Sequence, residues 1–136
     1  LPYIKGAYKL DDPTTCATQS GIYRIRKEAC ANLANHLDSP DAEEYLWKAI
    51  EAFQNYKFQT AKGLSMHYTV KGGEIFFDRK EKSITRATVN KAYHKAREVQ
   101  KSEGCVSGPK KLGTFGASYL YPVFIRIGVC GREKEE

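Results

Sequence analysis

The sequence predicts an α+β fold: two N-terminal helices, a small antiparallel β-sheet with a Gly-Gly hairpin, then a basic helix and a C-terminal apolar helix. Three observations indicate this order. Apolar residues recur at helical spacing in the first third of the chain and again in the last third. Between these stretches, apolar and polar residues alternate, which is typical of half-buried strands. Gly72-Gly73 separates two of the alternating runs and favours a tight hairpin turn.

The first two elements are expected to be helices. The first covers residues 20–37, whose apolar residues share one helical face. That face consists of Ile22, Ile25, Ala29, Cys30, Leu33 and Leu37. The second begins after Ser39, a good capping residue, with Pro40 at its first position and acids in its first turn. Trp47 falls off its buried stripe, so we expect this ring either to be an exposed contact or to cover the N-terminal segment.

The middle of the chain is expected to form three short strands, over residues 57–61, 65–71 and 74–78. The Gly-Gly pair joins the last two as a hairpin, and a polar connection over residues 79–84 follows. The period of the apolar residues then returns to that of a helix, which marks the end of the sheet.

Two helices are expected in the last part of the chain, over residues 85–102 and 114–127, with a loop at 106–113 between them. Gly128 is suited to end the second helix, because glycine readily adopts the left-handed conformation of a C-cap. Pro122 lies inside this helix, where proline is disruptive, so a strand over 123–129 is kept as an alternative. A winged-helix-like arrangement of all these elements is a further expectation.

The length of 136 residues predicts a single domain over residues 1–136, with an irregular segment at 1–19 and a disordered tail at 131–136. An apolar content of 41% excludes wholesale disorder. The four cysteines match no zinc-binding spacing, and we expect a reduced cytoplasmic protein rather than one with two disulfides. No apolar run approaches the roughly 18 residues of a membrane span, so no membrane partner is expected.

The positive charge is concentrated in one segment. Residues 79–111 contain ten basic and three acidic residues, a net charge of +7 against +6 for the whole chain. The remaining residues are therefore close to neutral. A near-neutral body with one basic segment is typical of a protein that binds a polyanion, and DNA is expected more than RNA.

The basic helix also carries side chains suited to a duplex. One stripe, distinct from its apolar stripe, consists of Arg86, Asn90, Tyr93, Arg97 and Lys101. Arginine and asparagine can each form paired hydrogen bonds to bases in the major groove, whereas lysines and hydroxyls contact phosphates. The predicted nucleic-acid-binding residues are Arg79, Lys80, Lys82, Ser83, Thr85, Arg86, Asn90, Tyr93, Arg97, Lys101, Lys110 and Lys111. The expected function is a non-enzymatic DNA-binding module.

Residues 108–114 resemble a nucleotide-binding loop only in part. Two glycines lie five residues apart, but Gly113 is followed directly by Thr114, so the lysine of a P-loop is missing. ATP or GTP is therefore not expected as a ligand, and no other cofactor is. A phosphate contact at the start of the following helix and an ordinary loop with an N-cap both remain open.

Two alternatives to DNA binding stay open. In the first, the basic surface docks an acidic protein partner, as an interaction or inhibitor module. In the second, Glu74, Asp78 and Lys80 form a weak nuclease pattern, in which carboxylates hold Mg²⁺ and a lysine positions the attacking water. The three histidines lie in no zinc-binding pattern, so no metal site is expected from them. The sequence leaves the oligomeric state open.

Overall fold

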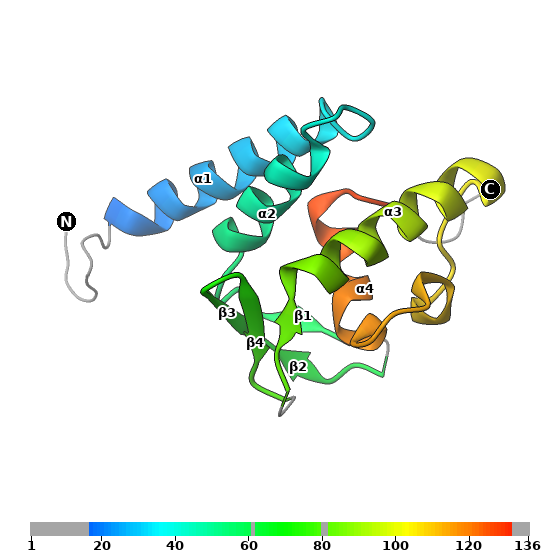
Figure 1. Cartoon of the computed structure of the whole chain (residues 1–136). Helices are drawn as coiled ribbons and strands as arrows, with labels where there is room; N and C mark the ends of the chain where they lie inside the picture. The colour runs from blue at the N-terminus through cyan, green and yellow to red at the C-terminus, as the bar shows by residue number, and fades with distance from the viewer. Residues whose placement is uncertain (1–16, 61, 80–81, 132–136) are drawn as a thin grey trace.

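The computed structural model of the chain describes residues 17–60, 62–79 and 82–131. In this part of the chain there are four α-helices and two small antiparallel sheets, which confirms the α+β class (Figure 1). Helices α1 (Ala17–Ala34) and α2 (Ala42–Ala52) lie side by side, and α3 (Arg86–Glu103) packs across α4 (Ala117–Ile127). The winged-helix likeness stays a prediction.

The first helix begins and ends three residues earlier than expected, and its apolar face is only partly buried. Leu33 is fully buried, but Ile22 and Ile25 are 41% and 57% exposed. The predicted apolar face therefore joins the core at its C-terminal end and is exposed at its N-terminal end. The second helix starts at Ala42 rather than at Pro40, because residues 37–41 form turns in which the Ser39 hydroxyl accepts a hydrogen bond from the Asp41 amide.

The strands form two separate sheets. Strands β1 (Phe58–Gln59) and β2 (Ser65–Met66) pair with each other, and β3 (Tyr68–Lys71), β4 (Glu74–Phe77) and β5 (Ile84–Thr85) form the second sheet. The predicted hairpin is confirmed: Lys71 pairs with Glu74, and Gly72 and Gly73 have φ angles of 58° and 78°. The strand expected over 65–71 is divided at His67, whose amide donates to the Asp78 carboxylate and whose carbonyl accepts from the Asp78 amide.

Strand β5 was not predicted, and it leads directly into α3. Its last residue, Thr85, caps the helix by accepting a hydrogen bond from the Thr88 amide. Helix α3 ends at Gly104, and α4 ends at Gly128, each with a left-handed backbone. Pro122 is accommodated inside α4, so the alternative strand at 123–129 was wrong. The expected loop before α4 contains a short 3₁₀ helix, η1 (Pro109–Leu112).

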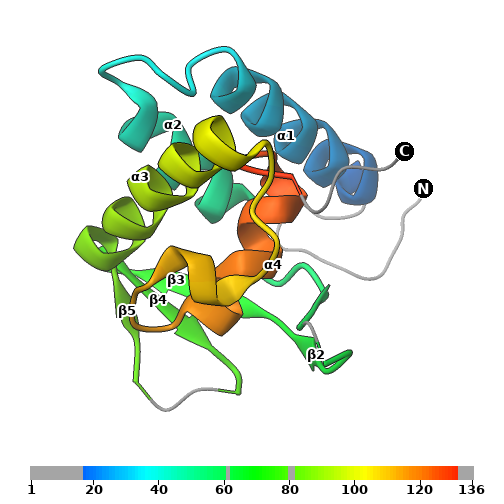
Figure 2. The same cartoon turned by 90° about the vertical axis from the view of Figure 1, so that its right-hand side faces the viewer.

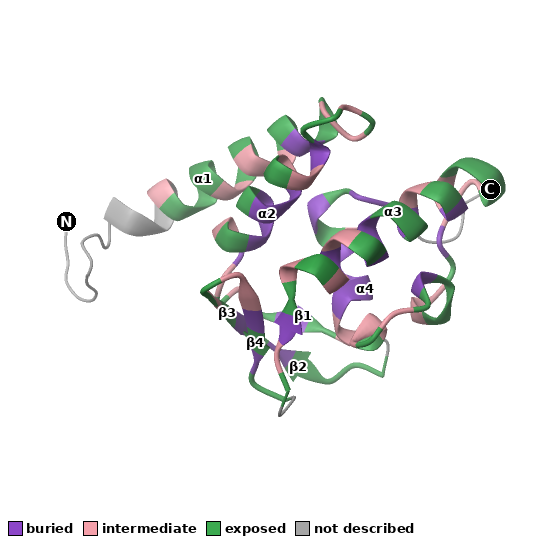
Figure 3. Ribbon diagram, in the orientation of Figure 1, coloured by how far each residue is buried: buried purple, intermediate pink, exposed green. Residues whose placement is uncertain are grey.

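One cluster of buried residues joins α2, α3, α4 and the inner faces of the sheets, whereas α1 exposes most of its surface (Figure 3). Tyr68 lies at its centre and donates its hydroxyl to the Ile50 carbonyl at 2.6 Å. Trp47 also belongs to this cluster and is only 6% exposed, which corrects the expectation of an exposed contact. The N-terminal segment that its ring was alternatively expected to cover lies largely outside the described residues. None of the described helices combines the length and the apolar character that a bilayer crossing requires.

Candidate nucleic-acid interface

The polar stripe of α3 exists, but it faces the end of α1 and the start of α2 rather than open solvent. At its N-terminal end, Arg86 donates from Nη2 to the Glu44 carboxylate at 3.0 Å. The same guanidinium lies 5.2 Å from the centroid of the Trp47 ring, so it is held by both charge and a cation–π contact. Arg86 is thus engaged within the protein at the position where base reading was expected.

Tyr93 lies at the middle of the stripe and is part of the core. Its side chain is 1% exposed, and its hydroxyl donates to the carbonyl of Leu37 in the turn between α1 and α2. Burial raises the pKa of this phenol. Because the ring is enclosed, Tyr93 offers no surface to a base, and its predicted contact role is not available in this conformation.

Asp38 neutralises the C-terminal end of the stripe. Its Oδ1 lies 2.8 Å from Nζ of Lys101 and 3.9 Å from Nε of Arg97. The hydrogen bond from Lys101 holds the pKa of the Asp38 carboxyl below its usual range. Arg97 is only 16% exposed and donates from Nη1 to the carbonyl of Val129 at 2.9 Å. Arg97 therefore ties α3 to the segment after α4.

Asn90 is the remaining residue of the stripe. It is half-buried, and its amide oxygen is enclosed with no hydrogen-bond partner among the described residues. Beside the stripe, the His94 ring lies 2.7 Å from the Glu43 carboxylate. The five residues predicted to read a duplex thus share one helix face, but that face is mostly occupied by the protein itself.

The hydroxyl residues before α3 also have internal partners. Ser83, directly before β5, donates to the carboxylate of Glu74 and so joins this position to strand β4. Thr85 is committed to the helix cap described above, and its hydroxyl also donates to that of Thr88 at 3.1 Å. These contacts hold the junction between sheet and helix, and they account for the small polar residues there without a phosphate.

Within the basic segment of residues 79–111, a second group of cations has no carboxylate within 4.0 Å among the described residues. It consists of Arg79, Lys82, Lys91 and Lys110, and we call it the α4-start group. Lys111 does not belong to it, because its Nζ lies 3.2 Å from the Glu103 carboxylate. Lys80 lies outside the described residues.

Two members of the α4-start group are tied to α4 by contacts of their own segments. Arg79 donates from Nε to the Ser65 carbonyl at 2.6 Å, and its own carbonyl accepts from the Tyr119 hydroxyl at 3.3 Å. These bonds join Arg79 to β2 and to α4. The 3₁₀ helix η1, which carries Lys110, packs against both α3 and α4, and Figures 1 and 2 show it beside α4. Lys82 lies two residues before β5.

Lys91 lines a shallow groove between α3 and the segment that follows η1. The groove has a volume of about 310 Å³, and Gly113 and Thr114 form its other wall. Gly113 has a φ of 62°, and the Thr114 hydroxyl is enclosed without a partner among the described residues. Helix α4 begins only at Ala117, with Gly116 at its N-cap, so Thr114 does not cap it. The phosphate contact at this segment stays a prediction.

The carboxylates of the nuclease pattern do not meet. Glu74 begins β4 and Asp78 directly follows its end, so four residues at about 3.3 Å each separate them by roughly 13 Å. Mg²⁺ binds its ligands at about 2 Å, so one ion cannot hold both. Asp78 instead pairs with His67 at 3.3 Å. No cluster of three metal-ligating side chains occurs in residues 17–60, 62–79 and 82–131.

Sequence reasoning missed the acids that contact α3, which are Asp38, Glu43 and Glu44. The signal of Glu43 and Glu44 was present as acids at the start of the second helix, which we interpreted only through the helix dipole. Asp38, in the turn before that helix, gave no such signal. Comparison of the chain with protein-family models, with curated proteins and with solved structures gives no match.

Proposed function

We propose that the protein binds the phosphate backbone of nucleic acid, and of duplex DNA in particular, through the α4-start group. The observation that supports this most is which of the basic side chains have a carboxylate partner. The stripe of α3 is matched by acids of the α1–α2 region, whereas Arg79, Lys82, Lys91 and Lys110 have no such match among the described residues. Unmatched lysines and arginines around one end of a helix can neutralise neighbouring phosphates and release their counterions.

This proposal narrows the function predicted from the sequence. Binding through phosphates carries no direct sequence information, because bases are read by side chains in the grooves. With Tyr93 buried and Arg86 held by Glu44 and Trp47, we expect affinity to depend little on sequence. A base-reading role for Arg86 and Asn90 remains a prediction, and it is tested by the same measurement.

The test is fluorescence-anisotropy binding to a mixed-sequence duplex across a salt series. Four phosphate contacts predict a log–log slope of about −3 to −4, and Lys82→Ala or Lys110→Ala should each reduce its magnitude by about 1. The matched control is Lys48→Ala, because Lys48 is an exposed lysine of α2 that does not line the groove of Lys91. Binding to several duplexes of different sequence tests the base-reading alternative, in which Arg86→Ala or Asn90→Ala changes the sequence preference.

Two results would overturn the proposal. The first is no saturable binding even at low salt, which would direct attention to an acidic protein partner for the same surface. The second is equal loss of affinity in Lys82→Ala, Lys110→Ala and the Lys48→Ala control, which would mean that only the net charge matters. A changed sequence preference in Asn90→Ala would restore the reading role of α3.

A further inference from the structure

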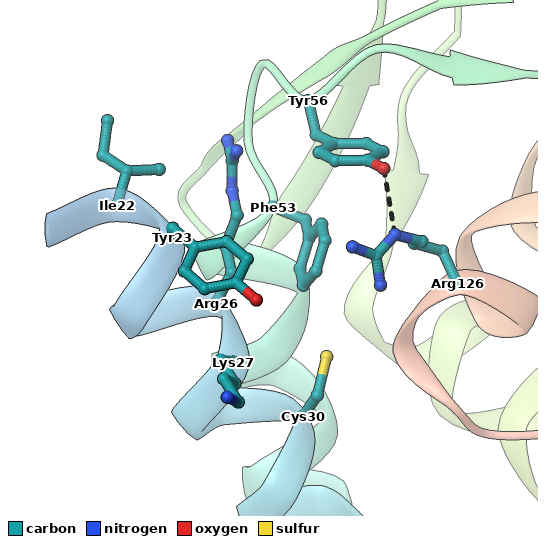
Figure 4. Close-up of a pocket in the computed structure, with 8 residues that line it drawn as sticks. All are labelled: Ile22, Tyr23, Arg26, Lys27, Cys30, Phe53, Tyr56 and Arg126. Carbon is teal, nitrogen blue, oxygen red and sulfur yellow. Dashed lines mark hydrogen bonds between the residues drawn. The ribbon is translucent and has the colours of Figure 1, made fainter. Parts of the chain in front are cut away.

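A pocket distant from the α4-start group lies between α1, the end of α2 and the end of α4 (Figure 4). Its volume is about 330 Å³, near the lower limit of small-molecule sites. Its walls combine three cations with three aromatic rings. They are Arg26, Lys27, Arg126, Tyr23, Phe53 and Tyr56.

Two guanidinium groups lie against the same pair of rings. The Cζ atom of Arg26 is 5.4 Å from the Phe53 centroid and 5.3 Å from the Tyr56 centroid. The Cζ atom of Arg126 is 5.1 Å and 5.2 Å from the same two centroids. Cation–π contact holds each arginine at the rings. Two positive charges are thus brought into one small space by helices about 100 residues apart in sequence.

Both guanidiniums are also fixed by hydrogen bonds. Arg26 donates to the carbonyls of Ala52 and Gln54 at 2.9 and 3.0 Å, which satisfies the end of α2. Arg126 donates from Nε to the Tyr56 hydroxyl at 2.9 Å, the bond drawn in Figure 4. An arginine has five N–H donors, so both terminal nitrogens of Arg126 keep donors that no described protein contact uses. These groups are held in place before any ligand arrives.

The pocket lacks a described counter-charge. Among the described residues, no carboxylate lies within 4.0 Å of Arg26, Lys27 or Arg126. Burial lowers the pKa of Arg26; the Tyr68 and Tyr56 phenols oppose this effect, and the charge of Arg126 adds a smaller lowering. The repulsion between these two cations would be relieved by an anion placed between them. Arg26 uses its guanidinium on two carbonyls, whereas the exposed Arg126 uses only its Nε among the described residues, on the Tyr56 hydroxyl.

We propose that this pocket binds an organic phosphate monoester. A phosphate monoester is largely a dianion at neutral pH, so it matches two fixed guanidiniums with Lys27 at the rim, whereas a carboxylate would neutralise only one charge. Its terminal oxygens accept the paired N–H donors that arginine presents. The apolar surfaces of Ile22 and Tyr23, which are 41% and 65% exposed, cover the organic part of the ester. This site is independent of the proposed nucleic-acid function.

The experiment measures binding of phenyl phosphate to the full chain by chemical-shift titration at constant ionic strength. Saturable binding is expected, with the shifts confined to α1, the end of α2 and the end of α4. Arg126→Gln should weaken binding by about tenfold or more, because a fixed charged donor is lost. Lys27→Gln should weaken it less. Arg24→Gln is the matched control, because Arg24 is exposed on the same helix but does not line the pocket.

Three companion ligands identify which part of the ester is bound. Benzoate carries a single negative charge, so it tests whether the second charge of the phosphate contributes to binding. It should bind at least about tenfold more weakly than phenyl phosphate. Inorganic phosphate tests the organic part and should also bind more weakly. A nucleoside 5′-monophosphate and a phosphotyrosine peptide distinguish a metabolite from a modified side chain as the source, and the tighter of the two identifies it.

The proposal is overturned if phenyl phosphate fails to saturate, or if Arg126→Gln and Arg24→Gln lose affinity equally. Equal affinity for inorganic and phenyl phosphate would also overturn it, because the apolar wall would then contribute nothing. Failure here is distinguishable from failure of the nucleic-acid proposal: Arg126→Gln should leave duplex binding unchanged, and Lys82→Ala should leave phenyl phosphate binding unchanged.

Discussion

Replacing Arg97 by methionine separates two accounts of α3. If Arg97 were a surface contact for DNA, Arg97→Met would reduce affinity and change stability by no more than about 0.5 kcal/mol. The structure instead holds this guanidinium 84% covered, with Nη1 bonded to the Val129 carbonyl at 2.9 Å. We therefore expect Arg97→Met to lower the free energy of unfolding and to leave duplex affinity unchanged in the folded variant.

The expected magnitude follows from the bond that is lost. A hydrogen bond to a charged group contributes about 1.5–3 kcal/mol, and Val129 is fully buried, so its carbonyl would remain without that donor. Methionine keeps most of the apolar stem, which limits the cavity that is created. The free energy of unfolding should fall by about 2 kcal/mol, which corresponds to a decrease in Tm of roughly 5–10 °C.

Urea denaturation followed by circular dichroism measures this change, and the urea dependence of the free energy should stay constant. The matched control is Lys95→Met on the same helix. Lys95 is 49% exposed and pairs only with Glu98, so its replacement should change stability by no more than about 0.5 kcal/mol. If Arg97→Met is as stable as the control and binds duplex more weakly, Arg97 is a surface contact and the reasoning fails.

Three further predictions concern titration and backbone conformation. The pKa of Asp38, followed by NMR, should lie below its usual range and should rise in Lys101→Ala. The ionised Asp38 therefore contributes to stability above the pKa of the unfolded state, and this contribution is lost as the pH falls through the lower pKa of the folded state. Burial raises the pKa of the Cys130 thiol to about 11, so iodoacetamide should alkylate this thiol slowly at pH 8 until the protein unfolds. The contribution of the neutral thiol to the free energy of unfolding is complete below about pH 9 and is lost as the pH rises through 11. Gly128→Ala should lower the free energy of unfolding by about 1–2 kcal/mol, because φ is 94° at this position even though a Cβ would meet no other atom. Gly21→Ala inside α1 should raise it by about 0.5–1 kcal/mol, and equal effects of the two substitutions would contradict the argument from backbone conformation.

Local signals predicted much of the fold. The Gly72-Gly73 turn, the apolar stripe of α2 and the end of α4 at Gly128 each depend on a few neighbouring residues, and all three are confirmed. Strand β5 was missed because two residues are too short to show a period. The exposed start of α1 was missed because its apolar spacing suits a buried face whether or not another element covers it.

The direction in which the α3 stripe faces could not be predicted, because it depends on packing between helices about 50 residues apart in sequence. The sequence shows Tyr93 within a polar stripe, and a tyrosine suits a core and a contact surface equally. Only the folded chain shows its hydroxyl on the Leu37 carbonyl and Asp38 beside Lys101. The pocket of Arg26 and Arg126 gives no local signal for the same reason.

The junction between β5 and α3 contains no intervening residue: Ile84 and Thr85 pair in the sheet, and Arg86 begins the helix. Side chains alternate between the two faces of a strand, and a helix turns about 100° per residue. Because no residue separates the two elements, the register of β5 in the sheet fixes the rotation of α3 about its own axis. One inserted residue at this point would turn the whole helix away from Glu44 and Asp38 at once. Insertions and deletions are therefore not tolerated at this junction, and we expect homologous chains to differ in length within residues 79–83 instead.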